Sequence, residues 1–299
     1  MLVPILRTQS EIHSLLESIT QDTANERWSD ARIYEALNLA LSVWQGRVMI
    51  PYIYTISGGW IAGTFEYSLP DYIDGPIQPQ RKRFVYDWSY WAGINSEDDT
   101  WTDIEAFDVE PTATGGQTLR LHYYNYETDG RVIWWGHNGP VPAVATLPVL
   151  NAGIDSDDTS LTLTTTPTVG RSGFIKINAE WMQYSGLTEA ASTLTLTNLV
   201  RGVNGTTAAS HSGSDTVTWG IALDDAGLLR QLLDQARAHM MEFYLSNSSS
   251  REVGHYEKQM VFYQQRADVF WRRYISSRKT RVRLSRASIG TIEHGMGWL

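Results

Sequence analysis

Residues 253–274 read VGHYEKQMVFYQQRADVFWRRY, and the fold expected of the whole chain follows from this segment and its counterparts. Apolar and aromatic side chains recur in it every three or four residues for about five turns, the spacing of one face of an α-helix. Such a seam packs against other helices at a shallow angle. Its members are Tyr256, Met260, Tyr263, Ala267, Phe270 and Tyr274.

Three other segments share this helical pattern. Residues 228–243 keep the same period after Asp224 or Asp225, either of which can cap the helix. Near the start, residues 8–11 form a capping box, in which Thr8 and Glu11 satisfy each other's backbone N–H groups. Ser29 is the expected N-cap of a further helix that ends near Gly46. Four amphipathic helices, two from each end of the chain, predict a helical bundle.

The middle of the chain has the composition of β-strands. Two aromatic runs flank an Asp129-Gly130 pair, a strong hairpin signal, and residues 159–164 and 192–197 alternate with period two. We therefore predict an α+β fold: a helical bundle from both chain ends with a large all-β insertion. The expected parts are a bundle of residues 1–50 and 222–278, a strand layer at 51–149, an inserted small β domain (barrel- or sandwich-like) at 150–221, and an extended C-terminal docking arm at 279–299.

Composition excludes several classes of protein. The 299 residues carry a formal charge of −9 and have no cysteine, so disulfides, thiolate zinc sites and thiol nucleophiles are absent. No apolar run approaches the roughly 20 residues that span a bilayer, and the start lacks the layout of a secretory signal. We expect a soluble protein made inside the cell, with no membrane partner.

Positive charge is concentrated near the C-terminus. Seven basic residues fall in a stretch without acids, so the rest of the chain carries a formal charge of −16. A basic arm with a hydrophobic tip on an acidic body is typical of a docking tail ordered by its partner. Arginine recognises carboxylate or phosphate groups, so both a protein surface and DNA stay open as its target. The docking candidates are Arg272, Arg273, Arg278, Lys279, Arg281, Arg283, Arg286, Trp298 and Leu299.

No catalytic pattern stands out. The sequence has no G-x-S-x-G elbow, no H-E-x-x-H pair and no phosphate-binding loop. The acidic run at 155–158 lacks the glycine and glutamate of an EF-hand loop and is interpreted as a solvated turn. We expect no enzyme activity, no cofactor and no metal. The histidines, each interpreted as structural or surface residues, are His13, His122, His137, His211, His239, His255 and His294.

Aromatic residues are abundant, with 12 Trp and 15 Tyr against 7 Phe. The clusters at 88–91 and 134–135 could cradle a sugar or a base on a strand face. Large aromatics more often fill a β core or a subunit interface. Composition leaves both interpretations open.

Residues 175–186 read IKINAEWMQYSG, and residues 200–211 read VRGVNGTTAASH, an R-G-x-x-G-T-x-x-x-x-H turn. These residues resemble a small β module that recurs in structural proteins of tailed bacteriophages. The glycines of this turn permit tight bends. We interpret Arg201 and His211 as scaffold.

The arrangement of helix, strand-rich middle and closing helices resembles the head-to-tail adaptor family of tailed phages. The segments concerned are 28–46, 101–135 and 224–278. The resemblance implies a homo-oligomeric ring, a dodecamer in that family, in which the helices build the ring and a C-terminal arm docks on the portal protein. The residues expected to pack between subunits are Trp44, Tyr256, Met260, Tyr263, Phe270 and Tyr274.

The function predicted from this resemblance is that of a structural virion protein at the head–tail junction, assembled in the host cytoplasm. Its ring would lie beneath the portal, extend the channel for double-stranded DNA and offer a platform to a tail or nozzle protein. An acidic body suits a DNA conduit, because like charge discourages sticking. A tail hub or baseplate protein is one alternative, and a carbohydrate-binding receptor protein that uses the Trp clusters is another.

Overall fold

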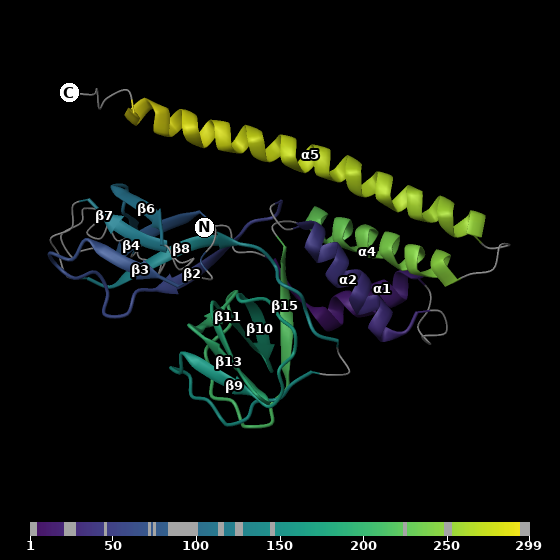
Figure 1. Ribbon diagram of the computed structural model, residues 1–299, viewed down its shortest axis with the longest axis horizontal. Helices are drawn as coiled ribbons and strands as arrows, with labels where there is room; N and C mark the ends of the chain where they lie inside the picture. The colour runs from purple at the N-terminus through teal and green to yellow at the C-terminus, as the bar shows by residue number, and fades with distance from the viewer. Residues whose placement is uncertain are drawn as a thin grey trace.

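The structure of the chain is a computed structural model (Figure 1). The residues that it describes in full are 5–20, 28–44, 47–70, 73, 76–82, 101–112, 117–122, 128–143, 147–223, 227–245 and 253–273. For residues 226, 246, 247 and 274–293 it describes the backbone alone.

Residues 147–223, called the β module below, hold two antiparallel sheets that include one strand from the start of the chain. The larger sheet has the order β1 (Ile5–Thr8), β15 (Val217–Leu223), β10 (Gly173–Ile177), β11 (Glu180–Tyr184) and β14 (Val200–Val203). The smaller has the order β12 (Leu187–Ala190), β13 (Thr193–Thr197) and β9 (Ser160–Leu163). The two runs with period two are thus neighbouring strands, and their leucines are buried.

Residues 50–136, called the β layer below, form two further antiparallel sheets. One has the order β2 (Ile50–Thr55), β8 (Gly130–Gly136), β4 (Ile77–Lys82) and β5 (Trp101–Asp103). The other has the order β3 (Glu66–Leu69), β7 (Gln117–Leu121) and β6 (Phe107–Pro111). Tyr52 and Trp134 stack at the centre of the first sheet, with ring centroids 5.0 Å apart.

The helices are α1 (Gln9–Thr20), α2 (Asp30–Trp44), α4 (Ala226–Asn247) and α5 (Val253–Glu293). The predicted capping box is confirmed at α1: Glu11 N–H donates to Thr8 Oγ1 at 3.2 Å, and Thr8 N–H donates to Glu11 Oε2 at 3.1 Å. Helix α2 packs on α4, and α4 packs on α5. Helices from both ends of the chain therefore lie together at one side of the molecule (Figure 1).

The predicted fold class is wrong, because the described part of the chain is mostly β and not a helical bundle with an insertion. Four antiparallel sheets supply most of the elements, and the helices cover one side. Nor is the β module a separate insertion, since β1, taken from the segment assigned to the bundle, pairs with β15 from Ile5–Leu223 to Thr8–Gly220. Helical periodicity identified the helices but carried no information on how many sheets the residues between them would form.

Amide side chains that are buried or partly buried join these parts. Asn138 pairs with both backbone groups of Ala222, accepting from its N–H and donating to its C=O at 2.9 Å each. Asn38 of α2 does the same for Val141 at 2.9 and 3.0 Å. Gln183 of β11 accepts from Ile53 N–H at 3.2 Å and so links the β module to the β layer. Because each amide satisfies backbone groups from a distant segment, the arrangement of the parts is specific.

Candidate functional site

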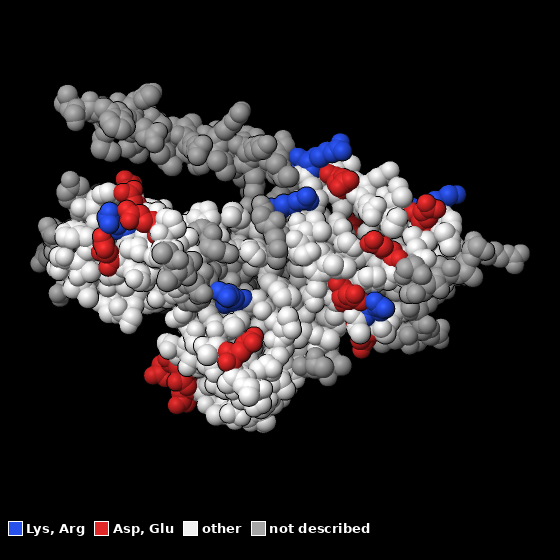
Figure 2. Space-filling model, in the orientation of Figure 1, with Lys and Arg blue, Asp and Glu red and all other residues white. Residues whose placement is uncertain are grey.

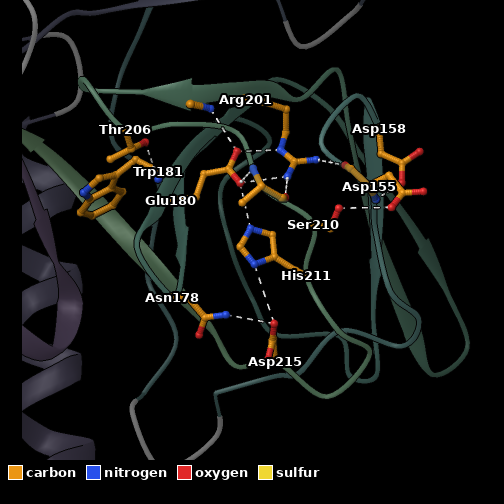
Figure 3. A network of polar contacts seen from close by, with 12 residues as sticks. Asp155, Asp158, Asn178, Glu180, Trp181, Arg201, Thr206, Ser210, His211 and Asp215 are labelled. Carbon is orange, nitrogen blue, oxygen red and sulfur yellow. Dashed lines mark hydrogen bonds and ion pairs between the residues drawn. The ribbon is translucent and has the colours of Figure 1, made fainter.

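A buried ionic network lies in the β module at the segment that resembles the phage module (Figure 3). Glu180, the first residue of β11, has a side chain that is 1% exposed. Arg201 of β14 binds it with two hydrogen bonds, Nε to Oε1 at 2.8 Å and Nη2 to Oε2 at 2.9 Å. His211 Nε2 lies 2.8 Å from Oε2. We call these three side chains the Glu180 lock.

Backbone groups complete the lock. The N–H groups of Gly202 and Ala209 donate to Glu180 at 3.1 and 3.0 Å, and Arg201 donates further to the carbonyls of Asp155 and Ala209. Burial raises the pKa of the Glu180 carboxyl, but the hydrogen bonds from Arg201, His211 and the two N–H groups outweigh burial and lower the pKa to about 2. Glu180 is therefore ionised at neutral pH.

The lock is closed to substrates. The side chains of His211 and Arg201 are only 3% and 8% exposed, and Asp215 lies 3.7 Å from His211 Nδ1 on the other side of the ring. Asn178 and the Ser212 N–H in turn bind Asp215, each at 3.0 Å. A carboxylate whose acceptor sites are all occupied inside the protein joins strands and turns and does no chemistry on a ligand. The geometry fits the interpretation of Arg201 and His211 as scaffold.

The predicted docking residues lie on α5 or beyond it. Arg272 and Arg273 are exposed on this helix. The arm expected to be extended from residue 279 is instead the continuation of α5, which runs to Glu293. Trp298 and Leu299 lie outside the described residues. The same holds for the side chains of Arg278, Lys279, Arg281, Arg283 and Arg286.

Of the residues expected to pack between subunits, Trp44 and Tyr263 are buried within the chain. Trp44 is 1% exposed, donates its indole N–H to Gln231 of α4, and meets the Trp271 ring edge-on. Tyr263 is 7% exposed and lies beneath Arg237, whose Cζ is 4.0 Å from the ring centroid. The others are Tyr256, Met260 and Phe270, partly buried against the core, and Tyr274, whose side chain is outside the described set.

A groove of about 560 Å³ runs between α4 and α5, and Phe270 of the predicted seam is part of its lining. Phe262, Val269 and Phe270 give it an apolar wall. Arg266 is paired with Asp234 at 2.9 Å, and Arg230 and Arg273 also line the groove. Sequence reasoning missed this α4–α5 groove, although the adjacent Val261 and Phe262 beside the Tyr263 seam gave a signal of a second apolar face.

The aromatic clusters and the acidic run at 155–158 lie in different surroundings, and one aromatic cluster is outside the described residues. Residues 88–91 lie outside the described residues. Trp134 is 2% exposed and belongs to the core, so it cannot offer a ring face to a sugar, while Trp135 is partly exposed. At the acidic run, which was interpreted as a solvated turn, Asp158 Oδ2 accepts the Asp155 N–H at 2.7 Å and closes the turn.

Neither the distribution of surface charge nor comparison with known proteins assigns a function to the chain. On the face shown in Figure 2, acidic side chains are spread over the β layer, the β module and the helices, with basic ones between them. Within the described ranges, no helix is both long and apolar enough to cross a membrane. No family model, no curated protein and no solved structure matches the chain.

Proposed function

We propose that the chain is a subunit of a phage head-to-tail adaptor ring, and the observation that carries this proposal is helix α5. It has 41 residues against the 22 of its packing partner α4, so at 1.5 Å per residue it is about 60 Å long against about 33 Å. Roughly half of α5 therefore extends beyond α4, as Figure 1 shows. Among the described elements, α4 is the helix that packs on α5, and we infer that the rest of α5 binds another protein.

The composition of this extension supports a docking role. Residues 278–286 hold five of the seven clustered basic side chains, on a chain whose net charge is −9. In the proposed ring, this arm binds acidic surface on the portal protein, and the acidic remainder of the subunits faces the passing double-stranded DNA. A tail or nozzle protein would bind the opposite end of the ring. The proposed location is the head–tail junction of the virion.

The α4–α5 groove supports self-association. Three apolar side chains of α5 that the seam does not use are strongly exposed: Val261 at 40%, Phe262 at 52% and Val269 at 48%. Large exposed apolar patches on soluble proteins mark interaction sites. A head-to-tail contact between identical subunits closes into a ring when its rotation allows. We therefore place the subunit interface of the proposed ring on this groove and not on the buried seam.

The central test is negative-stain microscopy of the purified full chain, with and without portal rings. Rings that stack coaxially on the portal are expected. Removing all residues after Tyr274 should abolish portal binding while circular dichroism still shows a folded subunit. If the truncated chain binds portal rings as well as the full chain does, the arm assignment is wrong. Immunogold labelling at the baseplate instead of the head–tail junction would overturn the adaptor role itself.

A substitution tests the ring interface. Val269→Asp places a charge in the α4–α5 groove and should shift the full chain from rings to monomers in analytical ultracentrifugation. The matched control is Val109→Asp on β6, since Val109 is also exposed, at 38%, but lies far along the chain in the β layer. Equal loss of rings in both variants would show that the groove is not the specific contact.

A further inference from the structure

We propose that His13, Glu17 and Asp30 form a binding site for Zn²⁺ that links α1 to α2. The three side chains each bring one nitrogen or oxygen ligand atom, and these atoms all lie within 4.8 Å of one another. His13 Nε2 is 3.3 Å from Asp30 Oδ1, and Nδ1 is 3.5 Å from Glu17 Oε2. His13 and Glu17 stand one turn apart on α1, whereas Asp30 is the first residue of α2.

The histidine itself indicates a missing ligand. Its side chain is nine-tenths buried, and within the described part of the structure Nε2 has no hydrogen-bond partner. The ring is held in place, because it stacks on Tyr34 with centroids 4.9 Å apart and planes 14° apart. Buried polar atoms in proteins are nearly always satisfied, so an oriented but unsatisfied imidazole nitrogen beside a carboxylate calls for an additional atom.

The donor set selects the metal. One imidazole nitrogen with two carboxylate oxygens suits Zn²⁺, whereas Ca²⁺ and Mg²⁺ prefer oxygen ligands alone. With zinc bonds of about 2.0–2.2 Å, neighbouring ligands in a tetrahedron lie about 3.3–3.5 Å apart. The distance from His13 Nε2 to Asp30 Oδ1 already has this value. A Glu17 carboxylate oxygen lies within 4.8 Å of the other two ligand atoms and would supply the third ligand.

The site also has an entry path. Asp30 and Glu17 are 42% and 20% exposed at their side chains, so a hydrated ion can reach the carboxylates and a water can take the fourth position. A bound ion would join the two helices at the start of α2, across the segment between Thr20 and Asp30. Because the metal would bind the folded chain, it would stabilise the helical side of the molecule.

The experiment is a calorimetric titration of the EDTA-treated full chain with ZnCl2, followed by thermal unfolding with and without the ion. One tight equivalent and a raised Tm are expected, with no rise in Tm from the same concentration of CaCl2. His13→Gln should abolish this equivalent. Asp30→Asn and Glu17→Gln should each weaken it at least about tenfold. The two carboxylate variants keep the test valid if the buried His13 variant fails to fold.

The matched control is His239→Gln, which removes another histidine near a glutamate, with Nδ1 3.4 Å from Glu242 on α4. It should bind zinc as the unaltered chain does. The proposal is overturned if the unaltered chain binds no zinc, if the Asp30 and Glu17 variants bind it equally well, or if His239→Gln loses binding as His13→Gln does. The measurement uses the isolated chain, so its outcome is independent of the adaptor proposal.

Discussion

Glu180→Gln is the substitution that tests the Glu180 lock most sharply. Glutamine keeps the shape of the side chain and one acceptor oxygen but removes the charge that faces Arg201 and His211. Since the Arg201 side chain is 8% exposed, its guanidinium would keep its charge and lose its carboxylate partner, with the carbonyls of Asp155 and Ala209 left as acceptors. The substitution should therefore destabilise the β module without altering its surface.

Two estimates give the size of the effect. Removing one partner from a buried ion pair costs about 3–5 kcal/mol. Lowering of the Glu180 pKa from 4.5 to about 2 corresponds, at 1.36 kcal/mol per unit, to about 3 kcal/mol of stability at neutral pH. We expect about 3 kcal/mol, because glutamine retains part of the hydrogen bonding.

The sign of the pH dependence follows from the direction of the shift. A carboxyl whose pKa is lowered by folding stabilises the folded state above its unfolded pKa of about 4.5, and this stabilisation is lost as the pH falls toward 2. The difference between the unaltered chain and the variant should therefore be full at pH 7 and reduced by about half or more at pH 3.

Hydrogen exchange followed by mass spectrometry of peptides from β10, β11 and β14 measures this effect locally. A loss of about 3 kcal/mol corresponds to roughly 100-fold faster exchange at pH 7. The control is Glu189→Gln, the same change at an exposed glutamate on β12, which should leave exchange unaltered. Exchange within threefold of the unaltered chain for Glu180→Gln, or a difference that does not narrow at pH 3, would refute the reasoning.

Two further predictions concern the same region. Gly202 has φ +64°, and a Cβ there would lie 2.9 Å from the Thr206 carbonyl oxygen, so Gly202→Ala should cost about 2–3 kcal/mol in urea unfolding. Gly205→Ala, at φ +75° but in open space, should cost only about 1 kcal/mol, and equal costs would contradict the steric argument. Asn138→Ala leaves both backbone groups of the buried Ala222 without their amide partner and should cost about 2–4 kcal/mol by the same assay. The exposed Asn151 serves as its control, since Asn151→Ala should be nearly neutral.

Much of the local structure could be predicted from the sequence because short-range chemistry controls it. The capping box at Thr8 and Glu11 and the start of α2 after Ser29 depend on atoms a few residues apart. The alternation at 159–164 and 192–197 likewise required one buried face, and both runs became strands of one sheet. By contrast, the extended arm predicted from residue 279 is helical to Glu293, since clustered charge marks exposure but does not specify backbone conformation.

The groups brought together over long distances could not be predicted in the same way. The sequence led us to interpret Arg201 and His211 as scaffold, but it did not identify Glu180 as their partner, because these residues meet only in the folded β module. His13 was one histidine among seven in the sequence, and only the packing of α1 beside α2 puts Asp30 against it. The apolar side chains of the α5 seam recur with the helical period, as predicted. This period does not show whether the helix that packs against them belongs to the same chain.

The sequence by itself determined the helices, many of the strands and the turns of this protein, because propensity, capping and hydrophobic period act within a few residues. Only the tertiary structure decided that the chain is mostly β, that β1 completes the sheet of the β module, and that the Trp44 and Tyr263 seam lies inside one chain. Sheet pairing and burial depend on which distant segments exclude water together, and a one-dimensional pattern does not contain that information.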